Sequence, residues 1–220
     1  MRTQLIKLYT WGTPNGNKIV IMLEECGLSY ELVPVNLGKR EQYSLEFLRI
    51  NPNAKIPAII DPDGPGGQPI TLFESGAILV YLADKTGRYI PVAPRERYLV
   101  LQWIMFQMAN TGPMFGQLHH FKASAPEGND YALDRYQREG ERLLDVLDGQ
   151  LAKKEFLAGP EYTIADICNW PWTRSWIHTL KNELGRRPHL VRWFERIEVR
   201  PAVWKAIEIY NTLRVTKIQS

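Results

Sequence analysis

Residues 5–27 read LIKLYTWGTPNGNKIVIMLEECG and predict a strand, a turn and a helix. Leu5–Tyr9 is a short run of strand type, and Thr10-Trp11-Gly12 forms the turn. Thr13 is a residue type favoured at a helix N-cap, and Pro14 fits the first helical position. Gly27 is a favoured residue for ending a helix. Between these ends, apolar residues recur at helical spacing, namely Ile19, Met22, Leu23 and Cys26.

The next sixty residues continue this alternation and then change to a hairpin. Tyr30–Val35 predicts a second strand, and Tyr43–Ile50 predicts a short helix. Ala58–Ile60 and Ile70–Phe73 predict a β-hairpin around a loop rich in proline and glycine. Ser75–Asp84 predicts one more helix. The first strand, helix and second strand make a βαβ unit with a parallel strand pair, and the whole order matches thioredoxin-like domains.

Strand patterns disappear from about Arg95, and the rest of the chain is helical in pattern. The segment 88–94 holds two prolines and has no periodicity, so it predicts a linker. We therefore expect a thioredoxin-like α/β domain at residues 1–87 and an all-helical bundle at residues 95–220. The longest helical patterns are Tyr98–Met108, Tyr131–Leu151, Ile164–Leu180 and His189–Glu198.

The composition of the 220 residues excludes several classes of protein. Hydrophobic residues make up 45% and charged residues 23%, as in globular domains. The net charge is +3 and the basic residues are scattered, which argues against nucleic-acid binding. No run approaches the roughly 18 apolar residues of a membrane span and no signal core is present, so we expect a cytoplasmic protein. Cys26 and Cys168 lack the spacing of a redox pair or a zinc site, so no metal is expected.

The first candidate site is the turn between the first strand and the first helix. In a thioredoxin-like domain a redox cysteine occupies this place, because the helix N-terminus stabilises a thiolate. Here Thr13 and Asn15 occupy it instead. The chain has no thiol of its own there, and one route to thiol chemistry is a thiol carried by a bound cofactor. A plain helix start, with Thr13 as N-cap, is the alternative explanation.

Two further segments lie where strands and turns meet. A cis Ile56-Pro57 bond would leave the backbone of Ile56 outside strand pairing and able to bind an extended peptide, whereas a rigid turn is the alternative. At Phe73-Glu74-Ser75-Gly76 the Ser75 hydroxyl and free N–H groups would bind a carboxylate, and Glu74 would hold an ammonium group. Alone, that segment is an ordinary helix start. Together the three segments match the thiol, the peptide backbone and the γ-glutamyl end of glutathione.

The chain resembles the glutathione transferase superfamily over nearly its whole length. Three segments carry this resemblance: NPNAKIPAI at 51–59, FESGAILVYLA at 73–83 and YTIADI at 162–167. In the last, Thr163 and Asp166 form a capping-box pattern that we interpret as a folding element. TPNG at 13–16, GPMFGQLHHF at 112–121 and RYQRE at 135–139 are similar to the nu class and to the fungal nitrogen-regulator proteins of prion type.

The resemblance implies a role for each matching residue. Nu-class relatives lack the usual catalytic tyrosine, serine or cysteine, so Thr13 and Asn15 are implied to face the glutathione sulfur as catalytic residues. Ile56 is implied to bond the cysteinyl backbone, and Glu74 with Ser75 to bind the γ-glutamyl end. Further glutathione contacts are implied for Gln42, Lys55 and Arg135. The sequence departs from the pattern at Ala54, where relatives often carry glycine or asparagine, and this leaves the contact of Lys55 open.

The resemblance also implies an activity, a cofactor and partners. It implies a glutathione-dependent disulfide-bond reductase that acts by thiol–disulfide exchange, with peroxidase activity and generally weak conjugation. Glutathione would be a bound co-substrate, small disulfides, hydroperoxides or electrophiles would be substrates, and the protein would be a homodimer. Two alternatives stay open: a transferase that conjugates small electrophiles, and a non-catalytic regulatory or assembly module.

Other chemical patterns are better explained by structure than by function. Cys26 and Cys168 lie in apolar helical patterns and are expected to be buried, inert thiols. His119-His120 lack a third ligand at metal spacing. Arg186-Arg187 is expected on the solvated surface. Core positions are expected for Trp170, Trp172 and Trp176.

Overall fold

The N-terminal part of the chain is built on a four-stranded sheet, in a computed structural model that describes residues 5–177 and 186–215. The strand order is β2-β1-β3-β4. β1 pairs in parallel with β2, β1 pairs with β3 antiparallel, and β3 pairs with β4 antiparallel. This is the predicted thioredoxin-like topology. The strands are β1 (Ile6–Thr10), β2 (Tyr30–Pro34), β3 (Ala58–Asp61) and β4 (Ile70–Phe73).

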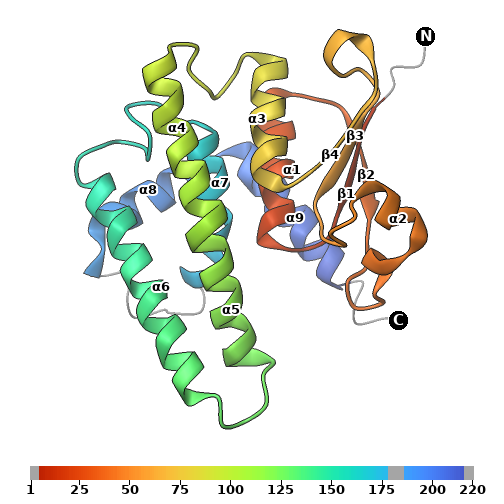
Figure 1. Cartoon of the computed structure of the whole chain (residues 1–220). Coiled ribbons are helices and arrows are strands. Elements are labelled where there is room, and N and C mark those ends of the chain that lie inside the picture. The colour runs from red at the N-terminus through yellow and green to blue at the C-terminus, as the bar shows by residue number, and fades with distance from the viewer. Residues whose placement is uncertain (1–4, 178–185, 216–220) are drawn as a thin grey trace. The chain divides into compact units, whose positions relative to one another are not determined.

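Helices cover both faces of this sheet. α1 and α3 lie on one face, and α2 lies on the other (Figure 1). α1 begins with Thr13 as its N-cap and ends at Gly27, whose φ of 67° is the left-handed conformation that glycine adopts most easily. The helices are α1 (Pro14–Cys26), α2 (Leu45–Ile50) and α3 (Ser75–Thr86), with 3-10 turns η1 (Glu41–Tyr43) and η2 (Pro65–Gly67).

In the rest of the described chain every regular element is a helix, as predicted. α4, a π-helical segment η3 and α5 follow one another without a break. The elements are α4 (Pro94–Phe106), η3 (Gln107–Thr111), α5 (Gly112–Ala123), α6 (Asp130–Leu151), α7 (Ile164–Ile177), α8 (Pro188–Glu198) and α9 (Pro201–Val215). The predicted end of α7 at Leu180 lies outside the described residues. No helix within the described ranges is long and apolar enough to cross a membrane.

Contacts divide the described chain into two compact units. One contains residues 5–88 and 199–215, and the other contains residues 89–177 and 186–198. α9 therefore packs with the sheet unit, where it lies against α1. Its Leu213 is buried in one cluster with Trp11, Val35 and Ala58. The domain limits 1–87 and 95–220 stay a prediction.

α7 begins at the predicted capping box. The Thr163 N–H donates to Asp166 Oδ2 at 3.0 Å, and the Ala165 N–H donates to Thr163 Oγ1 at 3.3 Å. Asp166 also accepts hydrogen bonds from the Leu157 N–H at 3.0 Å and from Trp193 Nε1 at 2.8 Å. One carboxylate therefore joins the start of α7 to the loop before it and to α8.

Three expectations about single residues are wrong, and one of them concerns Trp172, which is only half-buried. Arg187 is buried rather than solvated, because its Nε donates to Asp145 Oδ1 on α6 at 2.7 Å. Cys26 is only half-buried, and its sulfur lies 3.5 Å from Thr86 Oγ1. Burial still raises the pKa of the Cys26 thiol, so the thiol form is favoured. Cys168, Trp170 and Trp176 are buried as expected.

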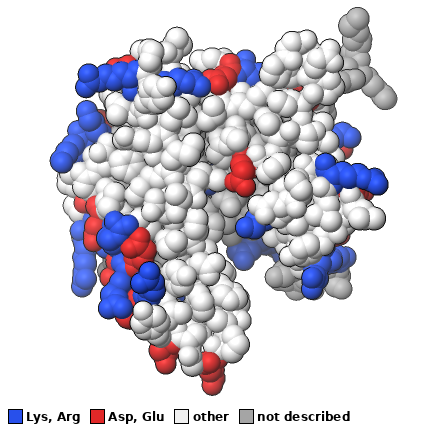
Figure 2. Space-filling model, in the orientation of Figure 1, with Lys and Arg blue, Asp and Glu red and all other residues white. Residues whose placement is uncertain are grey.

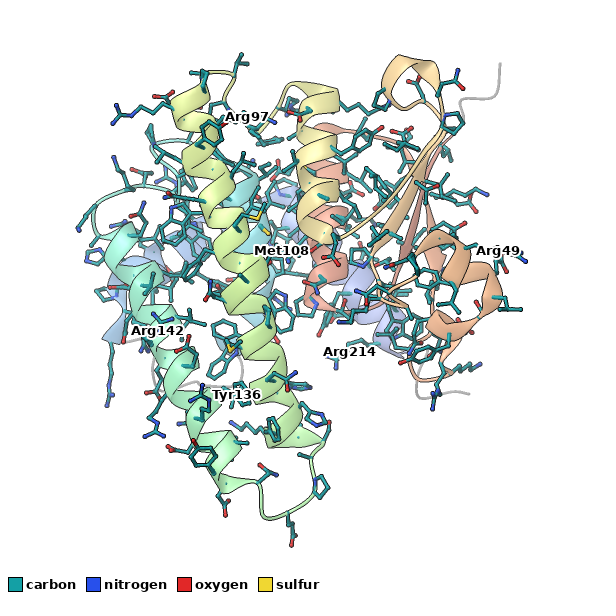
Figure 3. The ribbon with its side chains drawn as sticks, in the orientation of Figure 1. Arg49, Arg97, Met108, Tyr136, Arg142 and Arg214 are labelled. Atoms are coloured by element: carbon teal, nitrogen blue, oxygen red, sulfur yellow. The ribbon has the colours of Figure 1, made fainter. Side chains whose placement is uncertain are left out.

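Charged side chains are interspersed on the helical unit. Basic and acidic residues alternate along α6 in Figure 2, and two neighbouring pairs account for the pattern. Arg138 pairs with Asp134 at 2.6 Å, and Arg142 pairs with Glu139 at 2.7 Å. Arg142 points away from the ribbon in Figure 3, as a solvated pair requires. Such pairs contribute little to stability and provide no single-sign surface for a polyanion.

Candidate functional site

The register of the sheet explains why the candidate residues come together. Tyr9 in β1 pairs with Ala58 in β3, and Ala58 pairs with Phe73 in β4. These three residues form one row across three strands, at the end of the sheet where β1 and β4 finish and β3 begins. This end of the sheet is the site edge. The turn before α1 follows Tyr9, Ile56 precedes Ala58, and Glu74 follows Phe73. Since neighbouring strands are about 4.8 Å apart, the three segments start within roughly 10 Å of one another.

Thr13 and Asn15 open α1 at this edge. The Gly16 N–H donates to Thr13 Oγ1 at 3.2 Å, so the hydroxyl serves as an acceptor in this bond and keeps its own proton for another partner. Asn15 is half-buried one residue after Pro14. The first N–H groups of a helix have no acceptor inside it, and the dipole places positive charge there. The turn is suited to holding an anion.

Two glycines allow other parts of the unit to approach this turn closely. A Cβ on Gly16 would lie 2.3 Å from Thr10 Oγ1 and 2.7 Å from the Trp11 carbonyl oxygen. A Cβ on Gly12 would lie 2.6 Å from Arg214 Cγ on α9, the labelled helix-end residue in Figure 3. Any other residue at either position would push the N-terminus of α1 out of place. The C-terminal helix therefore helps to position the turn.

The segment before β3 presents its backbone beside this turn. The Ile56-Pro57 bond is cis, the conformation that would free the Ile56 backbone from strand pairing, and strand pairing starts only at Ala58. Asn51, which is buried, donates from Nδ2 to the Lys55 carbonyl oxygen at 2.6 Å and holds the loop. The side chain of Lys55 is exposed. Ile56 itself is buried, and its backbone lies outside the strand pairing that begins at Ala58.

The segment after β4 places a hydroxyl at the start of α3. Glu74 is exposed and has a φ of 70°, which turns the chain sharply from the strand into the helix. Ser75 is the first residue of α3 and is 3% exposed. Lys18 from α1, which is fully buried, donates from Nζ to Ser75 Oγ at 3.1 Å. α1 and α3 are therefore joined by a polar bond beneath the site edge.

Two other predicted residues lie elsewhere. Gln42 lies in η1, after β2, and its buried Oε1 has no hydrogen-bond partner within the described part of the chain. A buried acceptor of this kind is suited to an N–H group of a ligand.

Arg135 is exposed on α6, which belongs to the other unit, so its glutathione contact stays a prediction. No group of acidic, histidine and cysteine residues suitable for a metal occurs among the described residues.

Sequence reasoning missed two neighbours of the site. Lys18 precedes Met22 by one helical turn and therefore sits beside the apolar face of α1, which is an unusual position for a lysine. A lysine beside an apolar helix face could have marked Lys18 as a candidate from the sequence alone. The approach of α9 to Gly12 had no signal in the sequence, because the two segments are about 200 residues apart.

The chain matches two descriptions of one family and several named relatives. Residues 4–84 match "Glutathione S-transferase, N-terminal domain" and residues 111–201 match "Glutathione S-transferase, C-terminal domain". Disulfide-bond oxidoreductase YfcG of Escherichia coli (strain K12) is 48% identical over 204 residues, which cover 92% of this chain and 94% of YfcG. Disulfide-bond oxidoreductase YghU of the same organism is 40% identical over 210 residues, with 90% and 72% covered.

Solved structures agree with these matches. A glutathione transferase family member from Pseudomonas fluorescens pf-5 with two glutathione bound has a TM-score of 0.90 and 45% identity, with 95% of each chain covered. A glutathione transferase from Pseudomonas putida with one glutathione disulfide bound per subunit has a TM-score of 0.89 and 43% identity, with 94% of this chain and 93% of that chain covered. The chain belongs to the glutathione S-transferase family, as the resemblance implied.

Proposed function

We propose that this protein is an enzyme that reduces disulfide bonds with glutathione as a bound co-substrate. The row Tyr9, Ala58 and Phe73 carries the proposal, since it gathers three segments that match the three parts of glutathione. The start of α1 offers Thr13 and Asn15 and has no cysteine. Two relatives are named disulfide-bond oxidoreductases, and a similar structure holds glutathione disulfide, the oxidised product of such a reaction.

The chemistry is thiol–disulfide exchange in two steps. The thiolate of bound glutathione attacks one sulfur of the substrate disulfide, so that a mixed disulfide forms and the other sulfur leaves as a thiolate. A second glutathione thiolate then attacks the glutathione sulfur of the mixed disulfide, which gives glutathione disulfide and a second substrate thiolate. Two glutathione molecules supply the two electrons, and the two leaving thiolates take up the protons that the attacking thiols lost.

The chain's own residues stabilise and position the attacking thiolate. The Thr13 hydroxyl and the Asn15 amide each donate a hydrogen bond to the sulfur, and the dipole of α1 lowers the thiol pKa. The backbone of Ile56 pairs with the cysteinyl part of glutathione. Ser75 binds the γ-glutamyl carboxylate, and Glu74 binds the ammonium group. The further glutathione contacts in this proposal are Gln42, Lys55 and Arg135.

We further propose a cytoplasmic homodimer of the nu class. Tyr98 and Met105 on α4 are 71% and 60% exposed and are seven residues apart, so they lie on the same face of the helix. The surface over the middle of α4 and α5 also bears few charged side chains in Figure 2. An exposed apolar stripe of this kind is suited to a second copy of the chain.

Initial rates with two substrates test the activity. A hydroxyethyl-type disulfide and a chlorodinitrobenzene-type electrophile are compared, both with glutathione. We expect the disulfide to be turned over much faster than the electrophile. Faster reaction of the electrophile would instead indicate a conjugating transferase. Binding of glutathione without turnover of either would indicate a non-catalytic module and would contradict the proposal.

A further inference from the structure

Lys18 is a charged side chain with no exposure to solvent. It is 0% exposed, in the second turn of α1, and its Nζ donates to Ser75 Oγ at 3.1 Å. Burial of an ammonium group is unfavourable unless hydrogen bonds and nearby charges compensate it. The adjacent buried positions of α1, such as Ile19 and Met22, carry apolar side chains without this difficulty. The hydrogen bond to Ser75 is therefore part of what makes a lysine tolerable at this position.

The bond to Lys18 determines how Ser75 uses its hydroxyl. An ammonium group is a donor only, so Ser75 Oγ must accept in this bond and its proton is not used in it. A positive charge on the accepting side polarises the hydroxyl and strengthens the bond that its proton makes. Ser75 is also the first residue of the twelve-residue helix α3, where the helix dipole is positive. Each of these factors makes Ser75 a better donor to an anion.

We propose that Lys18 is a positioning residue for the γ-glutamyl carboxylate of glutathione and that it acts through Ser75. The inference rests on the proposed function, because that function places the carboxylate at Ser75. A carboxylate oxygen that accepts from Ser75 Oγ at about 2.7 Å lies within roughly 6 Å of the Lys18 charge, which is close enough to favour the ionised form. Lys18 does not touch the ligand, and its charge favours a ligand that carries a carboxylate at this position.

The test compares two ligands that differ only in this carboxylate. Glutathione and γ-aminobutyryl-cysteinyl-glycine share the ammonium group, the thiol and the rest of the chain, but the second lacks the γ-glutamyl carboxylate. Calorimetry gives the affinity of each ligand for the parent enzyme and for Lys18→Gln, Lys18→Met and Lys18→Arg. Lys18→Gln keeps a donor for Ser75 without charge, Lys18→Met removes both, and Lys18→Arg keeps the charge. Melting curves identify the variants that are folded.

We expect the preference for glutathione over the analogue to fall about five- to tenfold in Lys18→Gln and Lys18→Met, since a hydrogen bond to a charged group is worth more than a neutral one. Lys18→Arg retains most of the preference. In a Ser75→Ala background, Lys18→Gln changes the preference no further. Lys85→Gln is the matched control, because Lys85 pairs with Asp61 at 3.0 Å in the same unit and is not at the site. It leaves the preference unchanged.

Equal weakening of both ligands in the folded Lys18 variants would overturn the inference, because a purely structural role affects both alike. An unchanged preference in Lys18→Gln would overturn it as well. In both cases the parent enzyme still binds glutathione, so the proposed function stands. Failure of the parent enzyme to bind glutathione at all would contradict the proposed function itself.

Discussion

Ala54 is the residue where the sequence departs from the pattern that the family resemblance implies, and its backbone conformation gives the departure a physical meaning. Ala54 has a φ of 53°, in the left-handed region where a Cβ costs about 1–2 kcal/mol. Glycine relieves this strain but loses about 0.4–1 kcal/mol through its more flexible unfolded state. We expect Ala54→Gly to raise the free energy of unfolding by about 0.5–1 kcal/mol, as measured by denaturant titration.

Ala77 provides the opposite control for this prediction. It is exposed within α3, where glycine is less favourable than alanine by about 0.5–1 kcal/mol. Ala77→Gly should therefore destabilise the protein while Ala54→Gly stabilises it. Destabilisation by both would show that the loop at Ala54 is not strained.

Asn15 distinguishes activation of the thiol from plain binding. Its amide donates more strongly to a thiolate than to a neutral thiol, so Asn15→Ala should raise the pKa of bound glutathione. A raised pKa lowers the thiolate fraction at neutral pH and restores it as the pH rises. We expect the rate of disulfide reduction at pH 7 to fall at least several-fold and to recover partly at higher pH. Ultraviolet titration of the bound thiolate follows the same shift.

Different results for Asn15→Ala assign it a different role. A slower rate with an unchanged thiolate titration means that Asn15 positions the disulfide substrate. If neither quantity changes, Thr13 to Gly16 is only a helix start, and the functional interpretation of that segment is wrong.

Residue types at strand ends were sufficient to predict the two helix starts of the candidate site. Thr13 and Ser75 were identifiable because caps and helix starts depend on local sequence. The role of Lys18 was not, because it depends on a contact with Ser75, 57 residues away. The conformation of Ala54 was equally hidden, since only the folded loop determines its φ.

At the scale of elements, the strands and the hairpin were predictable, but the place of α9 was not. Periodicity reveals that a helix has an apolar face and does not reveal what that face covers. Arg200, the residue just before α9, forms a bidentate pair with Glu25 of α1, with Nη2 2.9 Å from Oε2. The Glu25 side chain is 9% exposed, so its charge needs a partner.

This pair leads to a prediction about the attachment of α9. Arg200→Met should lower the free energy of unfolding by about 1–3 kcal/mol, because it leaves a buried carboxylate without its bidentate partner. Lys205→Met within α9 removes an exposed pair with Glu208 and should change stability far less than Arg200→Met does. Urea unfolding measures both. Equal effects would mean that the Arg200 pair is no more than a surface contact.

Asp166 at the start of α7 makes stability depend on pH. Burial raises its pKa to about 6, although hydrogen bonds from Leu157, Trp193 and Thr163 oppose this. The unfolded value is about 3.9, so the folded state binds a proton first as the pH falls from 7 to 4. Its contribution to stability is therefore fully present below about pH 4 and is lost as the pH rises through 6.

Comparison with Asp166→Asn isolates this contribution, because the variant does not titrate at this position. The unfolding free energy of the parent minus that of the variant should become more positive by about 2–3 kcal/mol from pH 7 to pH 4. Thermal or denaturant unfolding at both pH values measures it. A difference that shrinks instead would mean that the hydrogen bonds to Asp166, rather than its burial, dominate its pKa.

At the scale of the whole molecule, composition and pattern predicted the two structural classes, and the resemblance of short motifs implied the family. They did not predict which charges are buried. Arg187 belongs to an exposed-looking Arg-Arg pair in the sequence, and its burial depends on Asp145, 42 residues earlier. Long-range pairing of this kind is decided by tertiary packing, which local patterns do not contain.

The assembly of two copies is the remaining property at this scale, and α4 provides its test. Met105→Lys places a charge in the apolar stripe that contains Tyr98, and burial of an unpaired charge in an interface is strongly unfavourable. We expect sedimentation to show a dimer for the parent enzyme and mostly monomer for Met105→Lys. Tyr131→Lys is the control, since Tyr131 is 78% exposed on α6, and it should remain dimeric. A dimer that withstands Met105→Lys must use another surface, and a parent enzyme that sediments as a monomer contradicts the homodimer altogether.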